Sequence, residues 1–122
     1  MGEPALDLSE IVDLYKEDAR LMIVKMREAL TRWDDAAEAA AARQELRRMS
    51  HQLRGSGRTY GFRSVTRVAK AMESIMLKVE KNVLPADERA REALRVKVER
   101  LASEFSATVA SADPPGLSGG KA

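Results

Sequence analysis

Apolar residues recur every three or four positions along most of the chain, which is the period of an amphipathic α-helix. The first stripe follows Asp7 and Glu10, which have the spacing of a capping box. Leu6 and Ile11 are placed as a hydrophobic staple around that cap, and the helix is expected to end near residues 31–35. The apolar positions of the stripe are Ile11, Val12, Tyr15, Ala19, Met22, Met26, Ala29 and Trp33.

Three more stripes follow the first. Asp35 and Glu38 repeat the capping-box spacing and predict a second helix that ends before Gly61, a natural helix stop. A third helix is expected over 64–81, and Pro85 is better suited to the start of a fourth helix than to its interior. The inward positions of the third and fourth helices are Val65, Val68, Ala69, Met72, Ile75, Met76, Val79, Leu94, Val98, Leu101, Phe105 and Val109.

Each predicted helix has a single apolar stripe, so none is stable alone and the stripes must face one another. Short connections between such helices predict an all-α fold, an antiparallel four-helix bundle, over residues 1–112. The methionines lie on the stripes and are interpreted as core filler. Residues 113–122 are rich in proline, glycine and serine, and we expect a disordered tail there. The bundle is expected to be monomeric.

Composition excludes several classes of function. The chain has no cysteine, which rules out disulfides, thiol catalysis and cysteine-ligated zinc and fits a reducing compartment. No apolar run approaches the roughly 20 residues that span a bilayer, and the acidic N-terminus lacks the features of a signal peptide. A net charge of +2 does not by itself imply nucleic acid. We therefore expect a cytoplasmic protein that binds neither membranes nor nucleic acid.

The single histidine, His51, is predicted to point away from the core. Winding the second helix at about 100° per residue, with Leu53 at the centre of the buried face, places His51 about 160° away. The buried side then holds Leu46, Met49, Ser50, Gly57 and Tyr60. The outer side holds, with His51, Gln44, Arg47, Arg48, Arg54, Gly55 and Arg58.

Two glycines of this helix have different interpretations. Gly57 faces inward and is expected to let another helix approach closely. Gly55 faces outward, where it fills no gap, although a mid-helix glycine costs about 1 kcal/mol relative to alanine. We interpret Gly55 as clearing a docking path to His51. A lone surface histidine, an exposed glycine or a face of arginines commonly has no special role, so spacing alone leaves both interpretations open.

The segment HQLRGSGRTYG, residues 51–61, resembles the signature of histidine-containing phosphotransfer (HPt) domains: His-x-Leu-Lys-Gly, two small residues and a glycine four positions later. Met72 and Glu73 are similar to the Leu-Glu pair of the family's next helix, and the resemblance covers about residues 8–110. Arg54 stands where lysine is usual, which keeps the charge but replaces a point charge with a planar fork. Arg58 and Tyr60 are bulkier or more polar than the family pattern. The residues that match the signature in register are His51, Leu53, Gly55, Ser56, Gly57 and Gly61.

The resemblance implies a four-helix bundle with an exposed histidine that takes and gives a phosphoryl group. Its partners would be receiver-domain aspartates of response regulators or hybrid histidine kinases in a two-component phosphorelay, and Mg²⁺ would be bound by the receiver. A neutral nitrogen of His51 would be the nucleophile, and we expect Arg54 and Arg58 to stabilise the phosphoryl group. No base within the domain is expected to be required. Partner docking is expected at Gln44, Arg47, Arg48 and Gly55.

The sequence predicts a carrier without kinase or ATPase activity and without a cofactor or metal of its own. The glycines of 55–61 follow no strand and precede no Lys-Ser/Thr pair that could cradle ATP. One alternative is an HPt-like module that is not phosphorylated and instead binds and titrates a receiver. A second is a nucleic-acid binder that uses the basic helix, but the basic face of this helix lacks interleaved aromatic residues.

Overall fold

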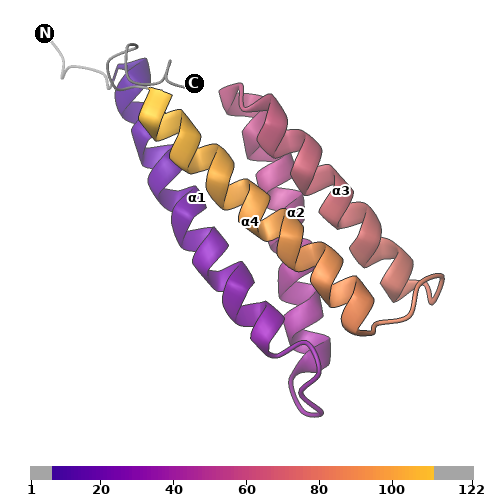
Figure 1. The fold of residues 1–122 in the computed structure, drawn as a ribbon. Helices are drawn as coiled ribbons and strands as arrows, with labels where there is room; N and C mark the ends of the chain where they lie inside the picture. The colour runs from indigo at the N-terminus through magenta and orange to yellow at the C-terminus, as the bar shows by residue number, and fades with distance from the viewer. Residues whose placement is uncertain (1–6, 112–122) are drawn as a thin grey trace, which may run out of the picture.

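The fold is an antiparallel bundle of four helices, as predicted (Figure 1). The computed structural model describes the backbone of residues 7–111 and the side chains of residues 7–106. Helix α1 spans Leu8–Thr31, α2 spans Ala39–Tyr60, α3 spans Arg63–Glu80 and α4 spans Glu88–Ser111. No strand occurs in residues 7–111. The tail predicted for 113–122, the staple residue Leu6 and the side chain of Val109 lie outside what is described.

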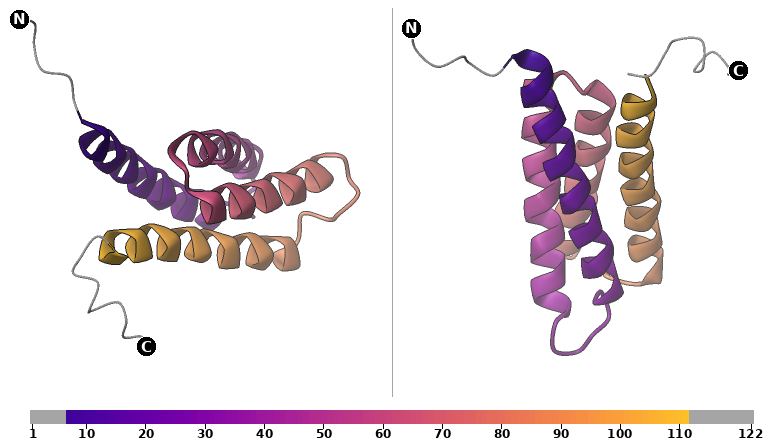
Figure 2. Two further views of the ribbon diagram at one scale, coloured as in Figure 1. Left: turned by 90° about the horizontal axis from the view of Figure 1, so that it is seen from above. Right: turned by 90° about the vertical axis from the view of Figure 1, so that its left-hand side faces the viewer.

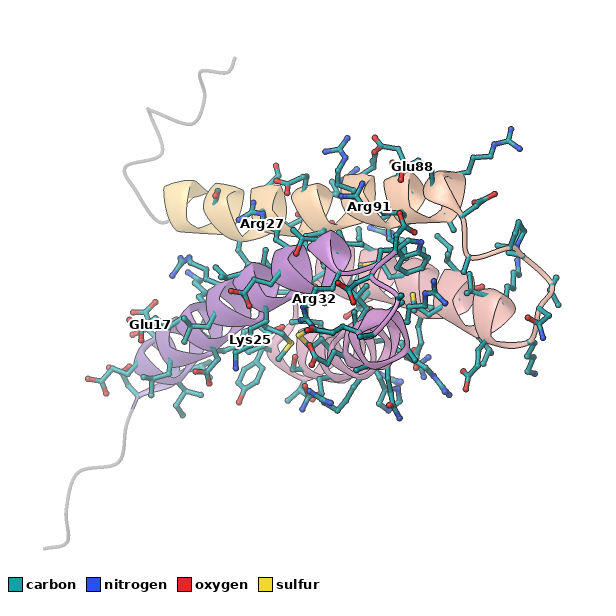
Figure 3. All side chains as sticks on the ribbon, turned by 90° about the horizontal axis from the view of Figure 1, so that it is seen from below. Glu17, Lys25, Arg27, Arg32, Glu88 and Arg91 are labelled. Atoms are coloured by element: carbon teal, nitrogen blue, oxygen red, sulfur yellow. The ribbon has the colours of Figure 1, made fainter. Side chains whose placement is uncertain are left out.

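Each helix packs beside its neighbours in the chain, and α1 and α4 close the bundle (Figure 2). Arg27 of α1 donates to both carboxylate oxygens of Glu99 on α4, at 2.9 and 2.8 Å. Figure 3 shows Arg27 at the side of α1 that faces α4. Less than one turn further along α1, the carbonyl oxygen of Leu30 accepts from Nε of Arg91 on α4 at 3.0 Å. None of the described helices is both long and apolar enough to cross a membrane.

The start of α1 follows the predicted capping box. The Asp7 carboxylate accepts from the backbone N–H of Glu10 at 2.9 Å, and the Glu10 carboxylate accepts from the backbone N–H of Asp7 at 3.1 Å. These hydrogen bonds satisfy backbone donors that have no partner within the helix. The Glu10 hydrogen bond, followed by that from Ser9, lowers the pKa of Asp7.

The capping box predicted for α2 is wrong in its second half. The Asp35 carboxylate accepts from the backbone N–H groups of Ala37 and Glu38 at 2.8 and 2.9 Å, so it caps a turn that leads into α2 at Ala39. The Glu38 carboxylate lies 3.5 Å from Arg32 instead of reaching back to Asp35. The positive charge of Arg32, the residue that follows α1, therefore directs the Glu38 side chain away from the cap (Figure 3 labels Arg32).

The later boundaries match the prediction to within a few residues. Gly61 ends α2 in the left-handed conformation at φ +83°, which explains the glycine there. Pro85 does not begin α4; it lies in the loop before the helix, which starts at Glu88. Asp87 caps α4 by accepting from the backbone N–H groups of Arg89 and Ala90, both at 3.1 Å. A single aspartate without a capping-box partner gave no clear signal in the sequence.

The core runs the length of the bundle and contains the predicted stripes. Trp33 and Phe105 are the largest fully buried side chains, and Trp33 also donates from Nε1 to the carbonyl oxygen of Asp87 at 3.2 Å. Six of the expected core residues, Ile11, Val12, Met22, Val68, Ile75 and Tyr60, are half-buried or exposed. The buried residues that match the predicted stripes are Tyr15, Ala19, Met26, Ala29, Trp33, Val65, Ala69, Met72, Met76, Val79, Leu94, Val98, Leu101 and Phe105.

Candidate functional site

His51 lies in the middle of α2 and points out of the bundle. Its side chain is 65% exposed, whereas Leu53, two positions along, is fully buried. The outward direction agrees with the prediction from helical winding, because a helix places residues two apart on nearly opposite faces. The exposed imidazole is thus held on a rigid helix and open to a partner from solvent.

Glu73 of α3 contacts the imidazole directly. Its Oε2 lies 2.6 Å from Nδ1 of His51, and its Oε1 accepts from Nη1 of Arg54 at 2.7 Å. The Glu73 side chain is only 17% exposed, so neighbouring side chains restrict its position more than that of His51. One carboxylate therefore links the histidine to the arginine one turn further along α2.

This contact determines the roles of the two ring nitrogens. A carboxylate can only accept, so Nδ1 of a neutral imidazole must carry the hydrogen that it donates to Glu73. Nε2 then holds the free lone pair, on the side of the ring away from the carboxylate. The arrangement provides a nucleophile of defined tautomer and orientation.

Glu73 contacts His51 but is absent from the site residues predicted from the sequence. The sequence places Met72 and Glu73 in a pair that resembles one in the family's next helix, and it predicts no need for a base within the domain. Helical winding finds only residues on the same helix as His51, whereas Glu73 lies on α3. Its position opposite His51 depends on the register between α2 and α3, which the sequence pattern does not specify.

The arginines predicted to support a phosphoryl group differ in their surroundings. Arg54 is 43% exposed and is held by Glu73 beside His51. Arg58 is seven residues from His51, about 10 Å along the helix axis, and has no ion-pair partner among the described residues. The structure thus brings Arg54 to the histidine through Glu73 and leaves Arg58 further away.

The predicted docking residues lie on the exposed face of α2, but they are not equivalent. Gln44 and Arg48 are exposed, and Arg47 donates to Glu80 of α3 at 2.6 Å. Gly55 is exposed, and a Cβ added to it would meet no heavy atom within 4 Å. The surface next to His51 is therefore open at Gly55.

Gly57 has the structural role predicted for it. A Cβ at this position would lie 2.8 Å from Oγ1 of Thr66 and 3.2 Å from its backbone nitrogen, so the first turns of α3 pack directly against α2 here. This close approach fixes the register of the α2–α3 pair, including the opposition of His51 and Glu73.

The prediction that Tyr60 faces the core is wrong. Tyr60 is 37% exposed, and its ring stacks on that of Tyr15 with centroids 4.5 Å apart. It belongs to an aromatic cluster at the rim, where the Tyr15 hydroxyl accepts from Ser56 at 3.1 Å. Burial raises the pKa of Tyr15, and the hydrogen bond from Ser56 opposes that shift. The helix ends at Tyr60, so its side chain projects past the packed layer.

The described residues contain no group of three or more histidine, cysteine, aspartate or glutamate side chains that could hold a metal ion. The family model described as "Hpt domain" matches residues 10–104. No curated protein and no solved structure matches the chain. The match includes His51, Glu73 and Arg54 and extends over parts of all four helices. By its sequence and its four-helix bundle, the chain belongs to the Hpt domain family, the phosphocarrier modules of two-component signalling that interact with receiver domains.

Proposed function

We propose that the protein carries a phosphoryl group on Nε2 of His51 and exchanges it with the aspartates of receiver domains. The observation that carries this proposal is the contact of Glu73 with Nδ1, because in the neutral ring it holds the hydrogen on Nδ1 and leaves the lone pair on Nε2 of an exposed side chain. The open surface at Gly55 supports it, since a receiver must bring its aspartyl phosphate within bonding distance of the ring.

The transfer step balances without a further acid or base. The Nε2 lone pair attacks the phosphorus of an aspartyl phosphate, the N–P bond forms, and the P–O bond to the aspartate breaks to release its carboxylate. The ring keeps its Nδ1 proton and becomes positively charged. The Glu73 carboxylate compensates that charge across the 2.6 Å contact, which lowers the free energy of the transition state as the charge develops.

Arg54 acts on the phosphoryl oxygens in this mechanism. It is held one turn from His51 by Glu73, so its guanidinium needs little reorganisation to donate to an incoming phosphoryl group. Arg58 adds positive charge at longer range. Transfer of this kind depends on positioning and charge compensation more than on covalent catalysis by the protein. We propose a carrier without kinase or ATPase activity, located in the cytoplasm.

The test is phosphorylation of the purified chain by a phosphorylated receiver domain and, separately, by acetyl phosphate. We expect one acid-labile, alkali-stable phosphoryl group on the wild type and none on the His51→Gln variant. ³¹P and ¹⁵N NMR of the labelled protein should place the phosphorus on Nε2. Label on another residue, or on Nδ1, would contradict the mechanism. A receiver that binds tightly but transfers nothing would instead indicate the module that only titrates receivers.

A further inference from the structure

A groove of about 370 Å³ lies between the first turns of α2 and the last turns of α3. Its apolar wall consists of Ala40, Met76 and Val79, and its polar rim includes Arg43 and Gln44. Nothing in the mechanism at His51 uses this groove. An apolar wall combined with a few placed polar groups is typical of binding sites.

The groove lies on the same surface strip as His51. Arg47 of α2 pairs with Glu80 of α3 at 2.6 Å, and Arg54 of α2 pairs with Glu73 of α3 at 2.7 Å. The two ion pairs are therefore separated by seven residues on each helix. Seven residues are almost two full turns, so the two pairs face the same direction about 10 Å apart. A partner seated over His51 therefore extends across the groove without bending.

Gln44 stands seven residues before His51 and so takes, beside the Arg47–Glu80 pair, the position that His51 takes beside the Arg54–Glu73 pair. The Arg47–Glu80 pair thus has the Gln44 amide beside it, where the Arg54–Glu73 pair has the imidazole of His51. The amide can form hydrogen bonds but not accept a phosphoryl group. Its chemistry is suited to recognition.

Arg43 gives the groove a fixed positive charge. Its guanidinium carbon lies 4.8 Å from the centroid of the Trp33 ring, and Nη2 donates to the Trp33 carbonyl oxygen at 3.1 Å. Its Nε is buried without a hydrogen-bond partner, and no carboxylate within residues 7–106 forms an ion pair with it. Since Arg47 is already neutralised by Glu80, the excess charge of the groove comes from Arg43.

We propose that this groove receives an acidic side chain of the receiver domain that exchanges phosphoryl groups with His51, and that it selects the partner. The methylene groups of a glutamate would contact Ala40, Met76 and Val79, and its carboxylate would pair with Arg43. The inference rests on the proposed function for the identity of the partner. A receiver with a lysine at that point is rejected, because like charges brought together across an interface cost affinity.

The test measures the dissociation constant of the receiver domain that binds the wild type most tightly in a panel of purified receivers from the same organism. Ala40→Leu fills the groove, and Ala41→Leu is its matched control, because both alanines are exposed in the first turn of α2 and only Ala40 lines the groove. Leucine and alanine both favour helix, so folding is little affected. We expect Ala40→Leu to raise the dissociation constant about fivefold or more and Ala41→Leu to change it less than twofold.

A charge series at Gln44 tests the chemistry of the occupant. Gln44→Glu should weaken binding and Gln44→Lys should strengthen it, each by about threefold or more at low salt. Equal effects of the two alanine variants, or shifts in one direction for both Gln44 variants, would overturn the proposal. Phosphoryl transfer is measured separately. If the groove variants change receiver binding but His51 receives no phosphoryl group, the proposed relay is refuted and the groove proposal is not. If His51 is phosphorylated but the groove variants leave binding unchanged, the groove proposal is refuted and the relay is not.

Discussion

At the scale of single residues, the site depends on one carboxylate that serves two partners. Glu73 receives a hydrogen bond from the imidazole through one oxygen and from Arg54 through the other. Removing the charge of Glu73 leaves the positive charge of the ring uncompensated when Nε2 is phosphorylated. It also frees Arg54 from its place beside His51. A neutral amide can preserve the shape of this contact but cannot supply the charge.

We predict that Glu73→Gln lowers the rate of phosphoryl transfer to His51 by about ten- to a hundredfold, which corresponds to losing a hydrogen bond to a charged group worth about 1.5–3 kcal/mol. The measurement is the initial rate of labelling by a phosphorylated receiver. Glu99→Gln is the matched control, because it breaks another interhelical carboxylate–arginine pair, the one with Arg27, away from the site. Equal losses for the two variants would mean that Glu73 acts only through the stability of the bundle.

At the scale of elements, α2 carries two mid-helix glycines whose environments are opposite. Gly55 faces open space, while Gly57 is in contact with the start of α3. A mid-helix glycine lowers the stability of the helix by about the same amount at both positions. The presence of a glycine at each position therefore needs its own explanation. Packing against α3 explains Gly57. At Gly55 no packing explanation exists within the described residues, which favours a role in docking.

The two glycines can be distinguished by alanine substitution and chemical denaturation. Gly55→Ala should raise the free energy of unfolding by up to about 1 kcal/mol, because it restricts the unfolded chain and meets no atom in the folded one. Gly57→Ala should lower it by about 1–3 kcal/mol, the usual cost of overpacking, since its Cβ would press on Thr66. If Gly55 clears a docking path, Gly55→Ala gains stability while transfer from a receiver becomes slower. Loss of stability at both positions would contradict the difference in packing.

At the scale of the whole molecule, charge is divided unevenly. Residues 39–80, which form α2 and α3, contain nine lysines and arginines against three acidic residues, a net charge of +6. The whole chain carries +2, so the other residues sum to −4. The modest net charge therefore conceals a cationic side around His51. Such a field accelerates encounter with an acidic partner and orients it toward the histidine.

We predict that the association rate with a receiver domain falls about tenfold between 50 and 500 mM salt, because screening shortens the range of this field. Stopped-flow measurement across that range gives the slope of the association rate constant against salt concentration. Arg48→Gln should make the slope shallower. Arg89→Gln removes an equal charge from the exposed start of α4 and should leave the slope nearly unchanged. Identical slopes for both variants would show that net charge, and not its distribution, controls encounter.

The local features of this protein can be predicted from its amino-acid sequence alone. The helices, the all-α bundle, the cap at Asp7 and the stop at Gly61 follow from periodicity and from residues within a few positions of one another. The outward direction of His51 and the inward direction of Gly57 follow from winding one helix. The errors lie at the ends of helices, as at Glu38 and Tyr60, where side chains respond to neighbouring elements.

The contacts of His51 depend instead on how the helices pack against one another. The contact of Glu73, the seven-residue repeat of ion pairs and the groove beside Arg43 depend on the register between α2 and α3. That register is set by packing between helices, including the close approach at Gly57. Hydrophobic periodicity specifies which face of a helix is buried. It does not specify which turn of the neighbouring helix lies opposite, because sliding by one turn preserves the apolar stripe and changes every polar pair along it.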